Sequence, residues 1–462
     1  MPRNIAILVL DSVRKDLFDR RASRIQSMSE ASFEHAYAPS SWSTPSHASM
    51  FTGELPSDHG VHTYQRSFEH VQSSLFTTEL SHETLGVSAN VFAGSSCGFD
   101  RSFDRFNDVN SAWRYPEGLD PQEFGVGSGS YADYARFVLA ALASTGLFDS
   151  LRNGVAGFLH TQWKQLPGPK LVDDSGRGVC RIAERTLSSA EEPWFLFVNM
   201  MDAHIPLQHF VGLEKDIHLA DWSWCSDEHD VWELIEGKYP EYWSIRESVY
   251  EAYIEYLDRI VAHFIDQMMT STSNPTTVLI TADHGENHGE QSAMGMTNHK
   301  SSLSEQLLHV PLEIINPPCD TPETPDRFTL LDLPELVRTL INDKWIVPSR
   351  EVTPAEVMGM SAGPEPPEDA DVAHYTRTIR AAYQGDTKFV WDSLGGVKRY
   401  EVDSSVPSKQ TLIEQGVPLP DWAKQPFSVK ISEARRAAQV TGNRERKVSD
   451  TVESRLERLG YR

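Results

Sequence analysis

Residues 41–53 read Ser41-Trp42-Ser43-Thr44-Pro45-Ser46-His47-Ala48-Ser49-Met50-Phe51-Thr52-Gly53, the pattern of a loop that turns into a short helix. Thr44 is a favourable N-cap, and Pro45 suits the first helical position because its missing N–H would have no partner there. Gly53 fits a left-handed cap just past the end. The Ser43 hydroxyl would then lie at the positive end of the helix dipole, where free N–H groups can hold an anion. The alternative interpretation is an ordinary capped surface helix.

The same stretch resembles the signature of the sulfatase family, which belongs to the alkaline phosphatase superfamily. The family pattern is Cys or Ser, any residue, Pro, Ser, Arg, and then a helix that ends Thr-Gly. The resemblance implies that Ser43 is the nucleophile, either as a free hydroxyl or after oxidation to formylglycine. This sequence departs from the family pattern at His47, which stands where the family usually has Arg. His47 is expected to contact the substrate anion.

Acidic and imidazole side chains follow two strand-length runs of apolar residues. The run over 4–10 predicts a buried strand of a parallel sheet, and Asp11 follows it directly. A second run over 276–281 leads to Asp283 and His284. Ligands of open α/β sheets bind outside the carboxyl ends of the strands, and carboxylates and imidazoles bind divalent ions. A helix N-cap for Asp11 and a simple turn at 282–286 are the alternative interpretations.

The order of these residues along the chain also resembles the sulfatase family. The resemblance implies one divalent cation, Ca²⁺, Mg²⁺ or Mn²⁺, held by Asp11, Ser43, Asp283 and His284. Family members often carry a second Asp directly after the first, and this chain has Ser12 there.

Further polar residues are candidates for contact with the anion or the leaving group. His204 follows the buried run 194–200, in a position where a family His acts on the leaving group, so the resemblance implies a general acid or hydrogen-bond donor. Relatives carry a Lys or a His near the position of His299 and Lys300, and spacing does not separate these two. Many sulfatases have a Lys and a His after the strand that ends near Asn90; here Asn90 is the only polar candidate.

The alternation of strand-like and helix-like segments predicts an α/β protein. Its expected form is an alkaline-phosphatase-like sheet flanked by helices on both faces, with a small antiparallel sheet near the C-terminus. The expected divisions are a catalytic domain over 1–347, a linker over 348–371 that is rich in Pro, Glu and Gly, and a small subdomain over 372–462.

Finer elements are predicted within these divisions. The small subdomain is expected to contain strands over 377–383, 387–391 and 397–402 and a terminal helix over 449–462. A helix is expected over 131–147, within a region from 113 to 187 whose pattern is weak and which we expect to cover the site.

The composition of the chain limits which binding partners and which cellular compartment we expect for the protein. The 462 residues carry a net charge of −24, which disfavours nucleic acid and anionic membranes as partners. No stretch approaches the ~20 apolar residues of a membrane span, and no signal peptide is evident. We therefore expect a cytoplasmic protein whose four cysteines are reduced: Cys97, Cys180, Cys225 and Cys319.

The leading interpretation is a metal-dependent hydrolase of sulfate esters on a small molecule or a glycan. A phosphodiester or phosphonate monoester hydrolase, or a phosphoryl-group transferase, is the first alternative on the same scaffold. The second is an inactive member that only binds an anion, which Ser12 and His47 leave open. The sequence does not indicate the alcohol part of the substrate or the oligomeric state.

Overall fold

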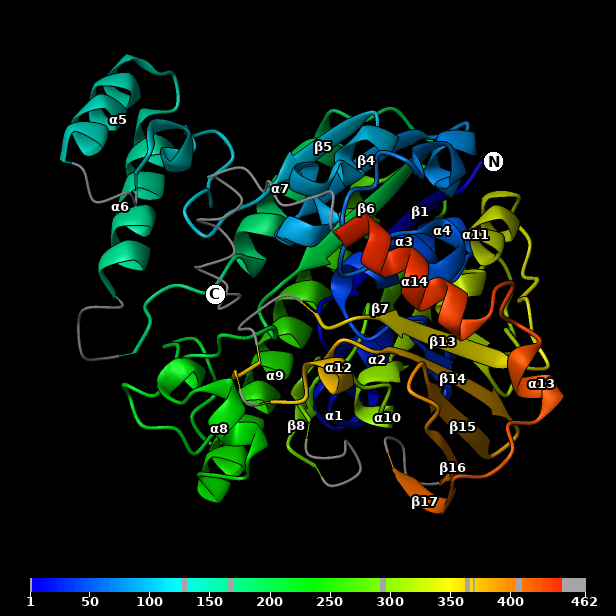
Figure 1. The fold of residues 1–462 in the computed structure, drawn as a ribbon. Coiled ribbons are helices and arrows are strands. Elements are labelled where there is room, and N and C mark those ends of the chain that lie inside the picture. Colours follow the sequence, from blue (N-terminus) through cyan, green and yellow to red (C-terminus); the bar gives the residue numbers. More distant parts are fainter. Residues whose placement is uncertain are drawn as a thin grey trace.

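A seven-stranded, mostly parallel sheet forms the centre of the molecule (Figure 1). The structure is a computed structural model and describes residues 2–126, 131–163, 169–290, 296–361, 366–368, 370–403 and 409–442. The strands, in order across the sheet, are β2 (Ala31–Ser32), β11 (Leu312–Ile315), β7 (Thr276–Thr281), β1 (Asn4–Leu10), β6 (Trp194–Met200), β4 (Glu83–Ser88) and β5 (Arg105–Asp108). Only β11 and β2 run antiparallel to their neighbours, β11 against β7 and β2 against β11.

Apolar residues of β1, β6 and β7 explain why these strands lie at the middle. All residues of these three strands are buried, as the continuous apolar runs in the sequence predict for strands covered on both faces. One group of helices comprises α1 (Lys15–Arg21), α2 (Ser23–Met28), α7 (Gly176–Ser188) and α9 (Pro240–Ser271), and the other contains α3 (Ser43–Thr52) and α11 (Leu333–Ile341). The predicted α/β fold with helices on both faces is confirmed.

A small antiparallel sheet follows the main sheet, as predicted. Its strands are β13 (Thr353–Met358), β14 (Thr378–Gln384), β15 (Thr387–Asp392), β16 (Val397–Val402) and β17 (Gln410–Gln415). The expectation of a linker over 348–371 is wrong for 353–358, because β13 lies there and pairs with β14. Pro354 and Glu356 are residue types that disfavour a strand prediction from sequence. In the fold, Glu356 is buried in an ion pair with Arg380 at 2.7 Å.

An antiparallel pair of helices, α5 (Tyr131–Ala143) and α6 (Leu147–Trp163), projects from the body of the molecule (Figure 1). The expectation that the region 113–187 covers the site is therefore wrong for these two helices. The predicted helix over 449–462 lies outside the described residues. Among the described residues, no helix has the length and apolar character needed to cross a membrane.

Candidate active site

The helix α3 begins at Ser43, two residues earlier than the sequence predicts. Trp42 is the N-cap residue, with an extended backbone and no side-chain cap. The prediction of Thr44 as the N-cap is therefore wrong, and the Thr44 hydroxyl is buried without a hydrogen-bond partner among the described residues. At the other end, Gly53 has φ 77° and is the predicted left-handed cap.

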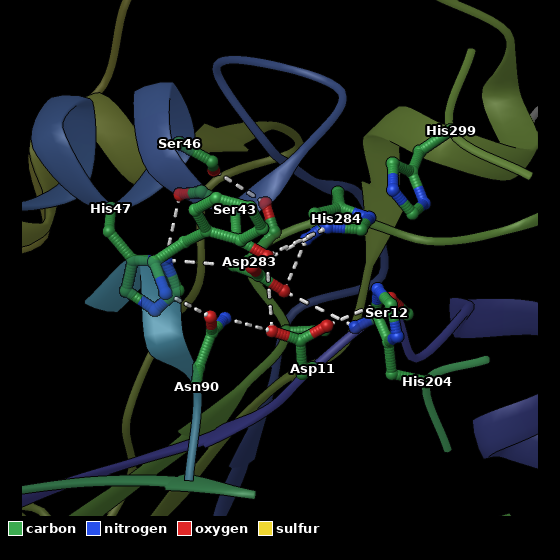
Figure 2. Close-up of polar contacts among 12 residues, drawn as sticks. Asp11, Ser12, Ser43, Ser46, His47, Asn90, His204, Asp283, His284 and His299 are labelled. Carbon is green, nitrogen blue, oxygen red and sulfur yellow. Dashed lines mark hydrogen bonds and ion pairs between the residues drawn. The ribbon is translucent and has the colours of Figure 1, made fainter. Parts of the chain in front are cut away.

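Two carboxylates meet at the carboxyl ends of adjacent strands. Because β1 and β7 pair in parallel with Val9 opposite Thr281, Asp11 and Asp283 leave the sheet side by side. Ligand-type atoms of Asp11, Asp283 and His284 all lie within 4.8 Å of one another (Figure 2). The fold thus brings together residues that are more than 270 positions apart in the sequence.

The hydroxyl of Ser43 points into this cluster. Its Oγ lies 3.2 Å from Asp11 Oδ2 and 3.3 Å from His284 Nε2 (Figure 2). His284 Nδ1 donates to the carbonyl oxygen of Gly285 at 2.7 Å, which leaves the lone pair of Nε2 on the side of Ser43 and the carboxylates. The predicted nucleophile and the predicted metal ligands therefore share one site.

Two further polar residues hold the carboxylates in place. The backbone N–H of Ser12, at φ 63°, donates to Asp283 Oδ1 at 3.2 Å, and its hydroxyl donates to Asp11 Oδ1 at 2.9 Å. Asn90 Nδ2 donates to Asp11 Oδ2 at 2.6 Å. Asn90, expected as a contact of the anion, is thus bound to Asp11. Ser12 orients both Asp11 and Asp283, at a position where family members often carry a further Asp.

The donor set fits a divalent cation. Asp11 and Asp283 are both fully buried, and burial followed by the charge of Asp283 raises the pKa of Asp11. Burial also acts to raise the pKa of Asp283, but His284 and His47 outweigh it and the pKa is lowered. The Oδ2 atom of Asp283 accepts no hydrogen bond among the described residues. A cation between two buried carboxylates would remove their repulsion and occupy this oxygen.

His47 is turned toward the protein rather than toward a substrate. It is fully buried; its Nδ1 donates to the carbonyl oxygen of Ser43 at 2.9 Å, and its Nε2 lies 3.1 Å from Asn199 Nδ2. Its Nδ1 is also 3.5 Å from Asp283 Oδ2. Both ring nitrogens are thus engaged, so this geometry does not favour the expected anion contact and instead makes His47 a residue that fixes the start of α3 against Asp283.

Two more histidines border the cluster on the side away from His47 (Figure 2). The ring centroid of His299 lies 5.0 Å from that of His284 and 5.3 Å from that of His204. His204 donates from Nδ1 to the carbonyl oxygen of Ile205. The structure therefore brings His204 and His299 to the site together, from elements far apart in the sequence.

Glu286 lies beside His299 on this side of the cluster. Glu286 Oε2 lies 3.6 Å from His299 Nδ1 and 3.9 Å from Arg246. Burial raises the pKa of Glu286, but His299 and Arg246 outweigh it and lower it to about 2. Lys300 is buried as well, and burial lowers its pKa to about 8. His299 lies beside the carboxylate of Glu286 and faces His284. These contacts distinguish His299 from Lys300 as a residue of the site, a distinction that sequence spacing does not make.

The sequence analysis missed Asn199 and Glu286. A polar residue inside the apolar run of β6 was the available signal for Asn199, because a buried amide needs a partner. Glu286 follows the Asp283-His284 pair directly and could have been grouped with it. Its proximity to His299 is a tertiary contact, which local sequence does not determine.

Gly285 is required by a close approach of two backbone segments. A Cβ at this position would lie 2.0 Å from the carbonyl oxygen of Gln306. We expect Gly285→Ala to lower the free energy of unfolding by about 1–3 kcal/mol, because the backbone must move to relieve the overlap. The shift would displace Asp283 and His284, so activity should fall too. Chemical denaturation and an activity assay test this, and unchanged values of both would contradict the close packing.

Comparison with known proteins identifies the class to which this fold and site belong. The sequence model of the family described as Sulfatase matches residues 3–324. The chain belongs to the sulfatase family, and it is an enzyme that hydrolyses ester bonds. No curated protein matches the chain in sequence.

Solved structures show the same fold at low sequence identity. A phosphonate monoester hydrolase of Agrobacterium radiobacter is 13% identical with a TM-score of 0.58, over 87% of this chain and 89% of that chain. The phosphonate monoester hydrolase SpPMH from Silicibacter pomeroyi is 14% identical with a TM-score of 0.56, over 86% and 89%. The protein BT4656, in complex with its substrate D-glucosamine-2-N,6-O-disulfate, is 10% identical with a TM-score of 0.55, over 99% and 98%.

Proposed function

We propose that this chain hydrolyses sulfate esters of a small molecule or a glycan, with Ser43 or its formylglycine derivative as the nucleophile. The observation that carries the proposal is the position of the Ser43 hydroxyl. It lies at the N-terminus of α3, within 3.3 Å of both Asp11 and His284. Free N–H groups at a helix N-terminus favour an anion, so a sulfate group can approach the hydroxyl.

Asp11, Asp283, His284 and Ser43 would hold one divalent cation, Ca²⁺, Mg²⁺ or Mn²⁺. When bound, the cation would supply positive charge that favours deprotonation of the nucleophile and offsets the charge of the sulfate oxygens. The mainly oxygen donor set, with no cysteine in the described cluster, suits these hard ions.

The side chains of the site would each have a separate role in the reaction. Attack by the Ser43 oxygen forms a bond to sulfur and breaks the bond between sulfur and the alcohol oxygen. The hydroxyl proton would pass to Asp11, to which Ser43 already donates. His204 would protonate the leaving alkoxide, and Lys300 and His299, the latter oriented by Glu286, would contact the anion from the same side.

A formylglycine at Ser43 would change how the sulfated intermediate is resolved. The hydrated aldehyde can expel sulfate by re-forming its carbonyl group, without a second attack at sulfur. An unmodified serine leaves a stable ester that water must cleave, a route that suits phosphoryl groups better. The second candidate function is therefore a phosphodiester or phosphonate monoester hydrolase, or a phosphoryl-group transferase, and an unmodified Ser43 would favour it.

An activity panel combined with mass spectrometry distinguishes these functions. Purified protein is assayed with aryl sulfate, phosphate monoester, phosphodiester and phosphonate monoester substrates, each with Ca²⁺, Mg²⁺ and Mn²⁺. We expect the sulfate ester to be the best substrate, with a peptide mass at Ser43 that is lower by two hydrogen atoms. A faster phosphonate or phosphodiester reaction with unmodified Ser43 would support the second candidate. Inactivity on every substrate together with no bound cation would support an anion-binding protein without catalysis.

We also propose that the protein is located in the cytoplasm. Reduced cysteines agree with it, since Cys97, Cys180, Cys225 and Cys319 are all free thiols. Fractionation of cells that produce the protein would test the compartment.

A further inference from the structure

The outer face of the projecting helix pair α5–α6 carries a concentration of exposed apolar side chains. Tyr131 is 92% exposed and Phe148 79% exposed, the largest values for apolar side chains on these helices. We define the apolar stripe by six residues, three from each helix: Tyr131, Leu139, Leu142, Phe148, Val155 and Phe158. Residues 148, 155 and 158 are separated by seven and three positions, which places them on one face of α6.

The inner face of the helix pair is already used. The ring of Phe137 lies against Gly154, and Tyr134 contacts Phe158 with ring centroids 6.0 Å apart, so the two helices run antiparallel. On the side that faces the body, Gly157 packs close to the side chains of Ala112, Pro121 and Val126. Phe158 borders the contact between the two helices and is still 49% exposed, and the other five residues of the apolar stripe lie on the face that this packing leaves outside.

We propose that the apolar stripe is the dimer interface of this protein, with the helix pair of a second copy packed against it. Two antiparallel helix pairs placed face to face form a four-helix bundle, a stable arrangement with twofold symmetry. The six side chains expose on the order of 800 Å², about what each partner contributes to an interface of standard size.

The charge distribution favours a second copy over other occupants. The helix pair contains only four ionised residues, and they form two local ion pairs, Asp133 with Arg136 and Asp149 with Arg152. A neutral face has no attraction for an oppositely charged partner, and it can meet its own copy without repulsion. The net charge of −24 would repel an anionic membrane. The two Arg of the helices, Arg136 and Arg152, each pair with an Asp rather than form the cationic face that binds peripheral helices to lipid headgroups.

The projection of the helix pair also suits self-association. Two bodies that each carry a charge of −24 repel when they come close. Contact through a projecting element keeps the acidic bodies apart while the apolar side chains are removed from water (Figure 1).

The test is the mass of the full-length protein in solution, measured by sedimentation equilibrium at micromolar concentration. We expect twice the chain mass of 51.9 kDa, both at low and at high sodium chloride concentration, because an apolar interface does not depend on charge attraction. The double variant Leu142→Glu/Phe148→Glu should raise the dissociation constant by at least about a hundredfold and yield monomer. Both positions are exposed, so circular dichroism and activity should stay unchanged.

A matched control places the same change on other exposed apolar residues. Ile346 and Leu394 are exposed and lie outside the helix pair, so Ile346→Glu/Leu394→Glu should leave the dimer intact. A monomeric wild-type protein would overturn the proposal, as would a dimer that the stripe variant does not dissociate. Co-sedimentation of monomeric protein with neutral phosphatidylcholine vesicles would also overturn it, since a lipid surface would then be the occupant.

Discussion

Replacement of Ser43 by alanine is expected to reduce kcat/KM by about 10⁴-fold or more, whichever ester is the substrate. The change removes the attacking oxygen, and loss of a nucleophile costs far more than loss of a residue that orients it. The overall fold should persist, because the hydroxyl contacts residues of the site such as Asp11 and His284 and does not cap α3. Steady-state kinetics and thermal unfolding of the same preparation measure both effects.

The control for this experiment is the adjacent hydroxyl. Thr44 is fully buried and its Oγ1 has no hydrogen-bond partner among the described residues. Thr44→Val keeps the shape and removes an unsatisfied polar group, so it should leave activity unchanged and be neutral or stabilising. Full activity of Ser43→Ala, or loss of activity in Thr44→Val alone, would contradict the assignment of Ser43.

Replacement of Asp283 by alanine should abolish cation binding and lower activity by a similar factor. Asp283 offers the Oδ2 atom that accepts no hydrogen bond, and its loss leaves Asp11 and His284 as the only ionisable members of the described cluster. Metal content is measured by elemental analysis after dialysis, and binding of added Ca²⁺, Mg²⁺ and Mn²⁺ by calorimetry. Retained stoichiometric binding in this variant would show that the ion lies elsewhere.

Asp202 supplies a matched control for the loss of a buried acid. It follows the neighbouring strand β6, is fully buried, and burial raises its pKa to about 6. It is not part of the described cluster of ligand-type atoms. Asp202→Asn should therefore keep its cation, whatever its effect on stability.

The sequence predicted the parts of the site that follow from strand ends. Asp11 and Asp283 come directly after apolar runs, and parallel strands place such residues at one edge. It did not predict the orientation of His47, because the family pattern implies an anion contact whereas Asn199 and the Ser43 carbonyl bind both ring nitrogens. The contact between Glu286 and His299 could not be predicted from the sequence either, since it depends on tertiary packing.

The same distinction holds for the fold. Continuous apolar runs predicted β1, β6 and β7 because strands buried on both faces need no alternation. Strand β13 was missed because its buried Glu356 is stabilised by Arg380 on the adjacent strand, and a local composition cannot show such a partner. The projection of α5–α6 from the body was not predicted, since a sequence shows an amphipathic face but not what that face contacts.

The central position of β1 affects how the protein must be synthesised. Its two neighbours, β6 and β7, begin at residues 194 and 276, so β1 gains its first partner in the sheet only after β6 has been made and its second only after β7. At ribosomal rates of about 5–20 residues per second, the interval between the end of β1 and the end of β7 lasts roughly 14–54 s. During that time an apolar strand with at least one free edge is open to aggregation. The nascent chain is thus a natural client for a chaperone that binds extended apolar segments, and it acquires its complete set of cation ligands only after Asp283 and His284 have emerged.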